Sequence, residues 1–373
     1  MAHERLGNID AMRGIAACLV IWQHSSEVFT QVPDIASHGV FLADVAWSVD
    51  LGRVGVVCFF LISGFVIPYS FSAGLGALKQ FGVRRFFRLY PAYWVSILSA
   101  LALAYLLSGK IYPLENIAAN LTMLQTFFAE PHILGVYWTL QVEVVFYALC
   151  GLLFFSGVLH DHFYQLSFCF LALSAFCALS IATKVSPAFD GVNKELIYIP
   201  YALSVMMTGT ILRTLLTTTL TPRTMKMLLT GPVCVFAIPA LTGVLHLLGM
   251  DVNGQPVRFA AGHMLGVALF LVGYKLLKSA PPIAIWLGMI SYSMYLFHPL
   301  AIKLVATLRA QSWASDVASL HMGVYMSVCI IITVLMAHFS YQFVERPSIR
   351  LGYILSHKYR RPQSEQCAER VVN

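Results

Sequence analysis

Charged residues are scarce in this chain. Asp, Glu, Lys and Arg together make up 11% of its 373 residues, against 58% hydrophobic residues. A water-soluble domain carries about a quarter charged residues and needs them to cover its surface. The composition therefore excludes a soluble globular protein and predicts a protein that lies in a membrane.

Cysteine motifs and common catalytic signatures are also missing. Seven of the eight cysteines lie inside apolar runs, and no CxxC or Cys/His ligand spacing occurs, so we expect neither a disulfide framework nor a metal site. A GxSxG elbow and a P-loop are absent, so the sequence gives no support to a hydrolase or an NTPase. No repeat of hydrophobic segments relates two halves of the chain, as it does in many transporters.

Long apolar runs are abundant. Each covers about 20 residues, enough to cross about 30 Å of hydrocarbon. They lie near residues 10–30, 52–75, 90–108, 133–156, 163–183, 195–216, 227–249, 258–278, 282–307 and 321–343. We therefore expect an all-α, polytopic membrane helical bundle of about ten transmembrane helices. The segment 116–130 fits a further short or re-entrant helix and is left out of this number.

The distribution of Lys and Arg predicts the orientation. With the N-terminus inside, sixteen of these residues fall in cytoplasmic segments and six in outer ones, as the positive-inside rule requires. An even number of helices then places both termini in the cytoplasm. The net charge of +7 is explained by this topology and by contact with anionic membrane lipids, so nucleic acid is not an expected partner. We expect a membrane domain over residues 1–346 and a basic, flexible cytoplasmic tail over 347–373.

Arg13 and His24 stand out because both lie in the first apolar run, where a bilayer penalises ionisable side chains by a few kcal/mol. This run also lacks a small-residue cleavage site, so we expect it to remain as a helix. Eleven residues of helix turn through about 1100°, about 20° more than three full turns, and rise about 16 Å. The two side chains therefore lie on one face and predict a polar path leading inward from one membrane surface.

A cluster of arginines precedes the third expected span, in the segment KQFGVRRFFRLYPAYW. Arg85 and Arg88 are three residues apart and Arg84 and Arg88 four apart, so at least two guanidinium groups can share a helix face. Arginine binds phosphate oxygens in pairs, and the head group of coenzyme A carries several phosphates. Anchoring of the helix on the cytoplasmic side explains the same cluster equally well.

Glu143 is a single carboxylate inside the apolar run GVYWTLQVEVVFYALCGLLFF. If its helix enters from the outer surface near residue 136, Glu143 lies about 10 Å deep, which is similar to the depth expected for His24. A carboxylate beside a histidine would hold the ring and stabilise the imidazolium of a general base. A buried pair that only locks two helices together remains the alternative.

Two further polar positions have simpler explanations. His298 precedes Pro299 and is either a second base or a partner for a backbone carbonyl that the proline leaves unpaired. Ser63 and Gly64 lie in the segment GVVCFFLISGFVIP, where small residues favour close helix packing.

Taken in order, these segments resemble the acyltransferase 3 family of integral membrane O-acyltransferases, from residue 6 to about 351. The resemblance rests on the Arg13 to His24 spacing with RGIAA between, GVVCFFLISGFVI, RRFFRLYPAYW, YWTLQVEVVFY and SYSMYLFHP, with FVERPSIR as a weaker block. It implies transfer of an acyl group, most often acetyl from acetyl-CoA, to a hydroxyl of a carbohydrate or small natural product. It also implies a bacterial cell (inner) membrane location, catalytic Arg13 and His24, and a donor site at Arg85 and Arg88.

The chain departs from many relatives at one block. Where they have VEEQFY, residues 142–147 here are VEVVFY, so Glu143 is the carboxylate that remains for the site. The chain also lacks the hydrolase-like domain fused to some relatives.

The resulting hypothesis is a direct transfer. Acyl-CoA docks on Arg85, Arg88 and Arg84, its pantetheine arm passes Arg13, and His24 with Glu143 activates the acceptor hydroxyl. A covalent acyl-histidine, a transporter using the same path and a membrane sensor or scaffold are the alternatives.

The acceptor is not encoded in a readable motif. Standalone relatives modify exopolysaccharide, O-antigen, lipochitooligosaccharide signals or macrolides, and we expect a glycan or glycolipid. Trp47, Tyr137 and Trp138 are candidates to stack on sugar rings near the outer face, although aromatic residues also gather at membrane interfaces.

Overall fold

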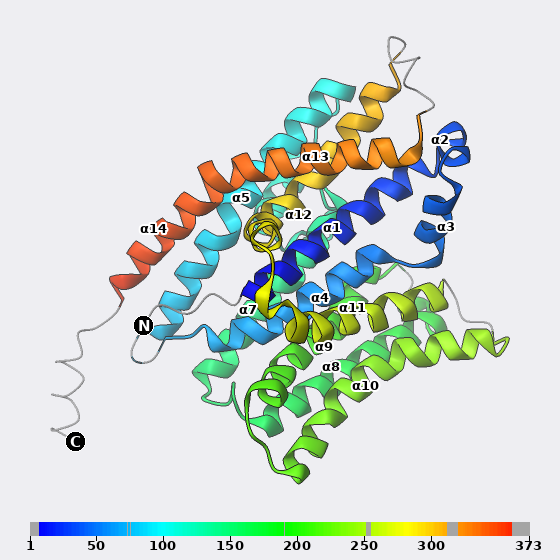
Figure 1. The fold of residues 1–373 in the computed structure, drawn as a ribbon. Helices are drawn as coiled ribbons and strands as arrows, with labels where there is room; N and C mark the ends of the chain where they lie inside the picture. Colours follow the sequence, from blue (N-terminus) through cyan, green and yellow to red (C-terminus); the bar gives the residue numbers. More distant parts are fainter. Residues whose placement is uncertain are drawn as a thin grey trace.

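The computed structural model describes residues 7–359 except 73, 75, 190, 251–254 and 312–319. These residues form helices joined by short connections, with no strand in the described ranges. The long helices are α1 (Gly7–Phe29), α4 (Leu51–Val66), α5 (Ala77–Ser108), α7 (Trp138–Phe155), α8 (His162–Val185), α9 (Lys194–Thr217), α10 (Pro222–Leu247), α11 (Pro256–Leu276), α12 (Pro282–Arg309) and α13 (Met322–Ser340). Figure 1 shows their arrangement.

The expected polytopic bundle is confirmed. Within the described residues, nine helices are long and apolar enough to cross a membrane, and each corresponds to one of the apolar runs expected from the sequence. The tenth run is α1, whose Asp10, Arg13 and Glu27 make it less apolar than the others. Its 23 residues span about 34 Å at about 1.5 Å per residue, so it is long enough to cross.

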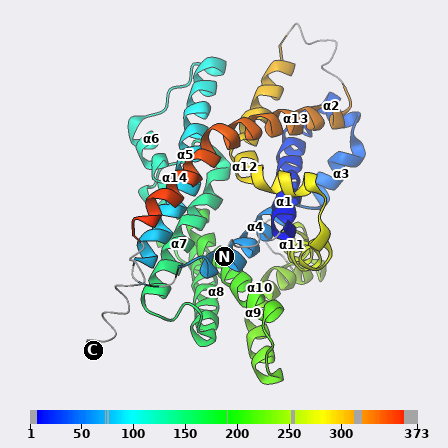
Figure 2. The same cartoon turned by 60° about the vertical axis from the view of Figure 1, so that its left-hand side comes forward.

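Helix α1 is packed against α4, α11, α12 and α13 and lies among its neighbours in Figure 1, while Figure 2 shows the bundle turned by 60°. Glycine permits this close approach. A Cβ added to Gly288 of α12 would lie 1.8 Å from the carbonyl oxygen of Asp10, and one added to Gly55 of α4 would lie 2.5 Å from that of Ala16. The neighbouring helices thus bury Asn8, Gln23, Ser25 and Ser26 among the polar residues of α1.

Close packing through Gly64 is also confirmed. A Cβ on Gly64 of α4 would lie 1.6 Å from the carbonyl oxygen of Met206 in α9, and one on Gly209 of α9 would lie 2.2 Å from that of Leu61. The two backbones touch here, so only glycine fits.

The segment 116–130 does not span the bundle. It contributes to α6 (Leu114–Leu121) and the 3₁₀ helix η2 (Gln125–Phe128), and a second 3₁₀ turn, η3 (Gly135–Tyr137), leads into α7. Tyr93 of α5 donates a hydrogen bond to the Asn120 carbonyl at 2.7 Å, and Tyr295 of α12 donates one to the Val136 carbonyl at 2.8 Å. These buried contacts fold the connection between α5 and α7 into the protein.

Two short helices not expected from the sequence, α2 (Pro33–Ser37) and α3 (Val40–Ser48), follow α1. The Gln23 amide contacts the Ala46 carbonyl at 3.4 Å, and Gly39 lies against Met322 of α13. These contacts hold α2 and α3 beside the end of α1.

The C-terminal helix extends further than expected. After α13, a π-helical turn η7 (Tyr341–Glu345) leads into α14 (Arg346–His357), which packs on α5 in both views (Figures 1 and 2). Gly352 lies against Phe87, and Ser356 accepts a hydrogen bond from Arg84 Nε at 3.0 Å. Residues 347–357, expected as part of a flexible tail, are therefore helical because α5 supplies packing partners, whereas 360–373 lie outside the described residues.

Candidate active site

A narrow cavity lies between α1, α4, α7 and α12. Its volume is about 60 Å³, and Arg13 and Glu143 line it together with Ser63, Thr139, Ser291 and apolar or aromatic side chains. A water molecule needs about 10–15 Å³ of such space, so the cavity holds a few waters or a thin chain. The structure thus brings together two of the residues that the sequence predicted for the site, Arg13 and Glu143.

Glu143 does not pair with His24 in the described structure, so the predicted contact is wrong. Its Oε1 accepts a hydrogen bond from Tyr147 OH at 2.5 Å, one turn along α7. The depth estimate assumed that residue 136 lies at the membrane surface, but Val136 is buried and bonded to Tyr295. Because α7 starts inside the protein, Glu143 lies deeper than expected and reaches the level of Arg13.

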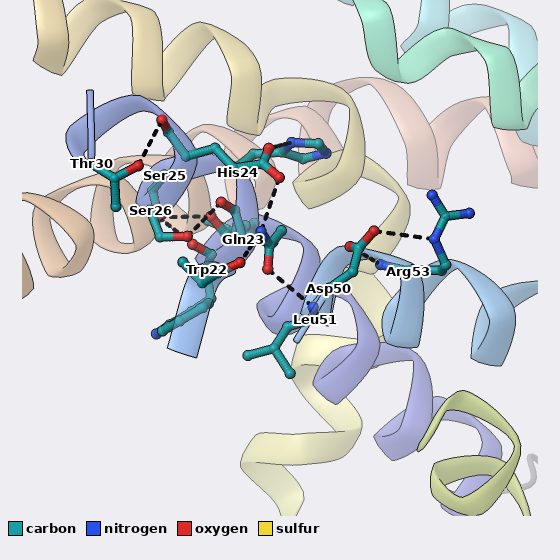
Figure 3. Close-up of polar contacts among 12 residues, drawn as sticks. Trp22, Gln23, His24, Ser25, Ser26, Thr30, Asp50, Leu51 and Arg53 are labelled. Atoms are coloured by element: carbon teal, nitrogen blue, oxygen red, sulfur yellow. Dashed lines mark hydrogen bonds and ion pairs between the residues drawn. The ribbon is translucent and has the colours of Figure 1, made fainter. Parts of the chain in front are cut away.

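The carboxylate beside His24 comes from the same helix. His24 Nδ1 lies 3.2 Å from Glu27 Oε2, and the Gln23 amide donates to Glu27 Oε1 at 2.9 Å. A carboxylate only accepts hydrogen bonds, so the neutral ring carries its proton on Nδ1 and keeps a lone pair on Nε2. Figure 3 shows His24 and Gln23 on α1 and the contact of Gln23 with the start of α4, where Gln23 Oε1 accepts from the Leu51 backbone at 3.0 Å.

His298 stacks on His24. The ring centroids lie 5.3 Å apart with an interplanar angle of 18°. His298 is fully buried, and its Nδ1 bonds to the Tyr295 carbonyl at 2.8 Å, which is the carbonyl that Pro299 leaves without a helical donor. The backbone role considered for His298 is therefore confirmed. Its Nε2 is buried and has no partner among the described residues.

The three arginines of α5 point to different partners. Arg88 Nη1 forms an ion pair at 2.7 Å with Glu345, which is fully buried and also accepts from Ser293 at 2.8 Å. Arg85 donates to the Ser70 hydroxyl at 2.6 Å. Arg84 instead contacts α14.

The environment of each arginine indicates what it can bind. Arg85 lies over the rings of Phe81 and Tyr147, with its Cζ 5.3 Å from each centroid, and Tyr147 is the partner of Glu143. The charge of Arg88 is balanced by Glu345, whereas Arg85 donates to the uncharged hydroxyl of Ser70. Arg85 is therefore better suited than Arg88 to bind an anion, because no carboxylate among these contacts neutralises its charge.

The sequence reasoning missed Glu27 and Glu345. The signal for Glu27 was available, since residues three apart share a helix face and Glu27 follows His24 by three. Glu345 follows the last apolar run, and a carboxylate at such a position is equally typical of a helix end exposed to solvent. Within the described residues, no three His, Cys, Asp or Glu side chains are grouped to hold a metal.

The three aromatic residues considered for sugar stacking differ in how far they are buried. Tyr137 is fully buried, with its hydroxyl 2.8 Å from Ser96, and Trp138 packs edge-on against Phe60 and Tyr198. Tyr137 therefore lies in the core, and Trp138 is partly buried against it, because η3 is folded inside. Trp47 on α3 remains 56% exposed.

Comparison with known proteins agrees with this architecture. Residues 6–339 match the acyltransferase domain model of the acyltransferase 3 family. The chain is similar to Nodulation protein 10 of Rhizobium leguminosarum bv. viciae, with 30% identity over 161 residues (38% of this chain and 42% of the relative). It is also similar to Acyltransferase MdmB of Streptomyces mycarofaciens, with 30% identity over 105 residues (26% and 27%). The alignments thus span less than half of each relative.

No solved structure matches the chain. The family match covers nearly the whole sequence, and the helical bundle places its Arg13 and His24 in the central helix. On these grounds the chain belongs to the acyltransferase 3 family.

Proposed function

We propose that this protein is a membrane O-acyltransferase that moves an acyl group, most simply acetyl, from cytoplasmic acyl-CoA to a hydroxyl of a cell-surface or secreted carbohydrate. Family membership supports acyl transfer. The observation that carries the proposal is the His24–Glu27 pair, in which a carboxylate holds Nδ1 and leaves Nε2 free to take a proton. The location in this proposal is a bacterial cell (inner) membrane.

The donor end of the proposed path lies at α5. No carboxylate among the described residues forms an ion pair with Arg85, which donates to the Ser70 hydroxyl, so we assign Arg85 the main phosphate contact. Arg88, paired with Glu345, supports it. Arg84, held by α14, is a weaker candidate. The cavity beside Arg13 and Glu143, at about 60 Å³, is wide enough for a thin pantetheine arm but too narrow for a sugar ring.

The chemistry takes place at His24 in this proposal. The acceptor hydroxyl loses its proton to Nε2 as its oxygen attacks the thioester carbonyl. The C–S bond then breaks, and the released CoA sulfur takes the proton from the imidazolium. Glu27 replaces Glu143 as the group that stabilises the imidazolium. Glu143 and Arg13 act lower in the path, where their opposite charges line the cavity.

The alternative of a transporter would use the same polar residues. The two are separated by measuring acetate esters on cell-surface glycans and secreted glycolipids in cells that express the wild type, His24→Ala or His357→Ala, at matched membrane levels. His357 lies exposed at the end of α14 and serves as the control. Loss of one ester signal in His24→Ala alone supports acyl transfer and identifies the acceptor, whereas identical profiles in all three strains contradict the proposal.

A further inference from the structure

A second pocket opens at the start of α11, apart from the narrow cavity. Its volume is about 300 Å³, and it is lined by Trp47 and Ser48 of α3, His246 near the end of α10, and Gln255 and Arg258 at the start of α11. Ligand pockets in proteins begin at about this size. The distribution of Lys and Arg predicts that this end of the bundle faces outward.

The pocket combines one large aromatic face with several polar groups. Trp47 is 56% exposed, and the Arg258 guanidinium carbon lies 5.9 Å from its ring centroid. Arg258 Nη1 donates to Gln255 Oε1 at 2.9 Å. Arg258 Nε is buried and has no partner among the described residues, so a donor at the pocket wall remains unsatisfied, which is uncommon in folded proteins.

Arg258 also connects the pocket to the proposed base. Its Nη2 lies 3.3 Å from Glu27 Oε1, and the other oxygen of Glu27 contacts His24. His24 stacks on His298, whose ring lies 5.6 Å from that of Tyr295, a residue that lines the narrow cavity. A continuous series of contacts therefore links the narrow cavity, the two histidines and the wide pocket.

We propose that this pocket, at Trp47, Gln255 and Arg258, binds the acceptor as an uncharged saccharide ring. The inference rests on the proposed function and names the place where the acceptor binds. A sugar presents an apolar face of C–H groups to an aromatic ring and hydroxyls to amide and guanidinium donors, and the pocket supplies both. Arg258 already forms an ion pair with Glu27, which leaves less of its charge for an anion, so the pocket favours a neutral saccharide over a phosphate group.

Direct binding measurements test this assignment. The 373-residue chain in lipid nanodiscs is titrated with a panel of labelled oligosaccharides, built from N-acetylglucosamine, glucose, galactose, mannose and uronic acids, and separately with desulfo-CoA as an unreactive donor analogue. We expect at least one neutral oligosaccharide to bind. Trp47→Ala should weaken that binding about tenfold or more, as truncation of a central aromatic anchor does, while Trp47→Phe should retain most of it.

Phe41→Ala is the matched control. Phe41 lies on the same short helix and is 76% exposed, but it does not line the pocket, so this variant should bind the oligosaccharide as the wild type does. Desulfo-CoA should bind equally to all four proteins. Absence of saccharide binding to the wild type, equal binding to Trp47→Ala, or displacement by phosphatidylglycerol but not by sugars would overturn the assignment. A wild type that binds saccharide through Trp47 but neither binds desulfo-CoA nor transfers acetyl would instead contradict the proposed function.

Discussion

Replacement of Glu27 by glutamine tests which carboxylate assists His24. A glutamine keeps an oxygen that accepts a hydrogen bond from Nδ1, so Glu27→Gln removes the negative charge beside His24, together with the ion pair to Arg258. At the observed 3.2 Å, an imidazolium and a carboxylate attract by about 1.3 kcal/mol at the dielectric constant of water and about 5 kcal/mol at an effective value of about 20.

The side chains of His24 and Glu27 are 41% and 40% exposed, so solvent screens the pair and the lower part of this range applies. A loss of about 2 kcal/mol of transition-state stabilisation corresponds to a decrease of about 30-fold in kcat. Since the pair acts on the imidazolium that forms during transfer, the KM for acetyl-CoA should change little.

The assay is transfer of radiolabelled acetyl from acetyl-CoA to endogenous glycans in membrane vesicles, with protein levels matched. Glu143→Gln is the informative comparison, because Glu143 lines the narrow cavity and its loss should raise the KM for acetyl-CoA. Full kcat in Glu27→Gln together with a large loss of kcat in Glu143→Gln would refute the assignment of Glu27 and restore Glu143 as the partner of the base.

Three further outcomes are expected. Arg85→Gln should raise the KM for acetyl-CoA about tenfold while leaving that for acetyl-pantetheine unchanged, since only the former carries the phosphates that a guanidinium binds; equal effects on both donors would exclude a phosphate contact. Glu345→Gln leaves Arg88 without its ion pair and should destabilise the protein by about 3 kcal/mol, seen as a lower Tm in detergent; an unchanged Tm would contradict a structural role for the pair. Gly64→Ala should abolish accumulation of folded protein, because its Cβ would lie 1.6 Å from a backbone oxygen of α9, whereas Gly82→Ala, with open space around it, should accumulate normally in the same membrane fractions.

The sequence predicted the number and approximate limits of the long helices well. In a membrane each helix satisfies its own backbone hydrogen bonds, so an apolar run of sufficient length specifies a span without knowledge of its neighbours. The cavity-lining position of Arg13 followed from a related argument, since a guanidinium in such a run must avoid lipid. Both predictions depend on local sequence alone.

Predictions that depended on the depth of one helix relative to another failed. The expected pairing of Glu143 with His24 required α7 to start at the surface, but the preceding connection is held inside by hydrogen bonds to Asn120 and Val136. The expected flexible tail ignored the surface of α5, against which Gly352 packs α14. Contacts between segments far apart in the sequence decide both cases, and periodicity contains no information about them.

The surroundings of the two stacked histidines explain why one of them suits the role of base. His298 is fully buried and bonded to a backbone carbonyl, so a positive charge on it would lie unpaired in the protein interior beside another imidazole, which is strongly unfavourable. His24 is partly exposed and has Glu27 to balance an added proton. His298 therefore stays neutral, with Nε2 as a fixed hydrogen-bond acceptor that can orient a hydroxyl, and its ring limits the positions that His24 can adopt. In this pair His24 transfers the proton and His298 positions the hydroxyl, whereas a single imidazole at the end of a narrow path could not do both.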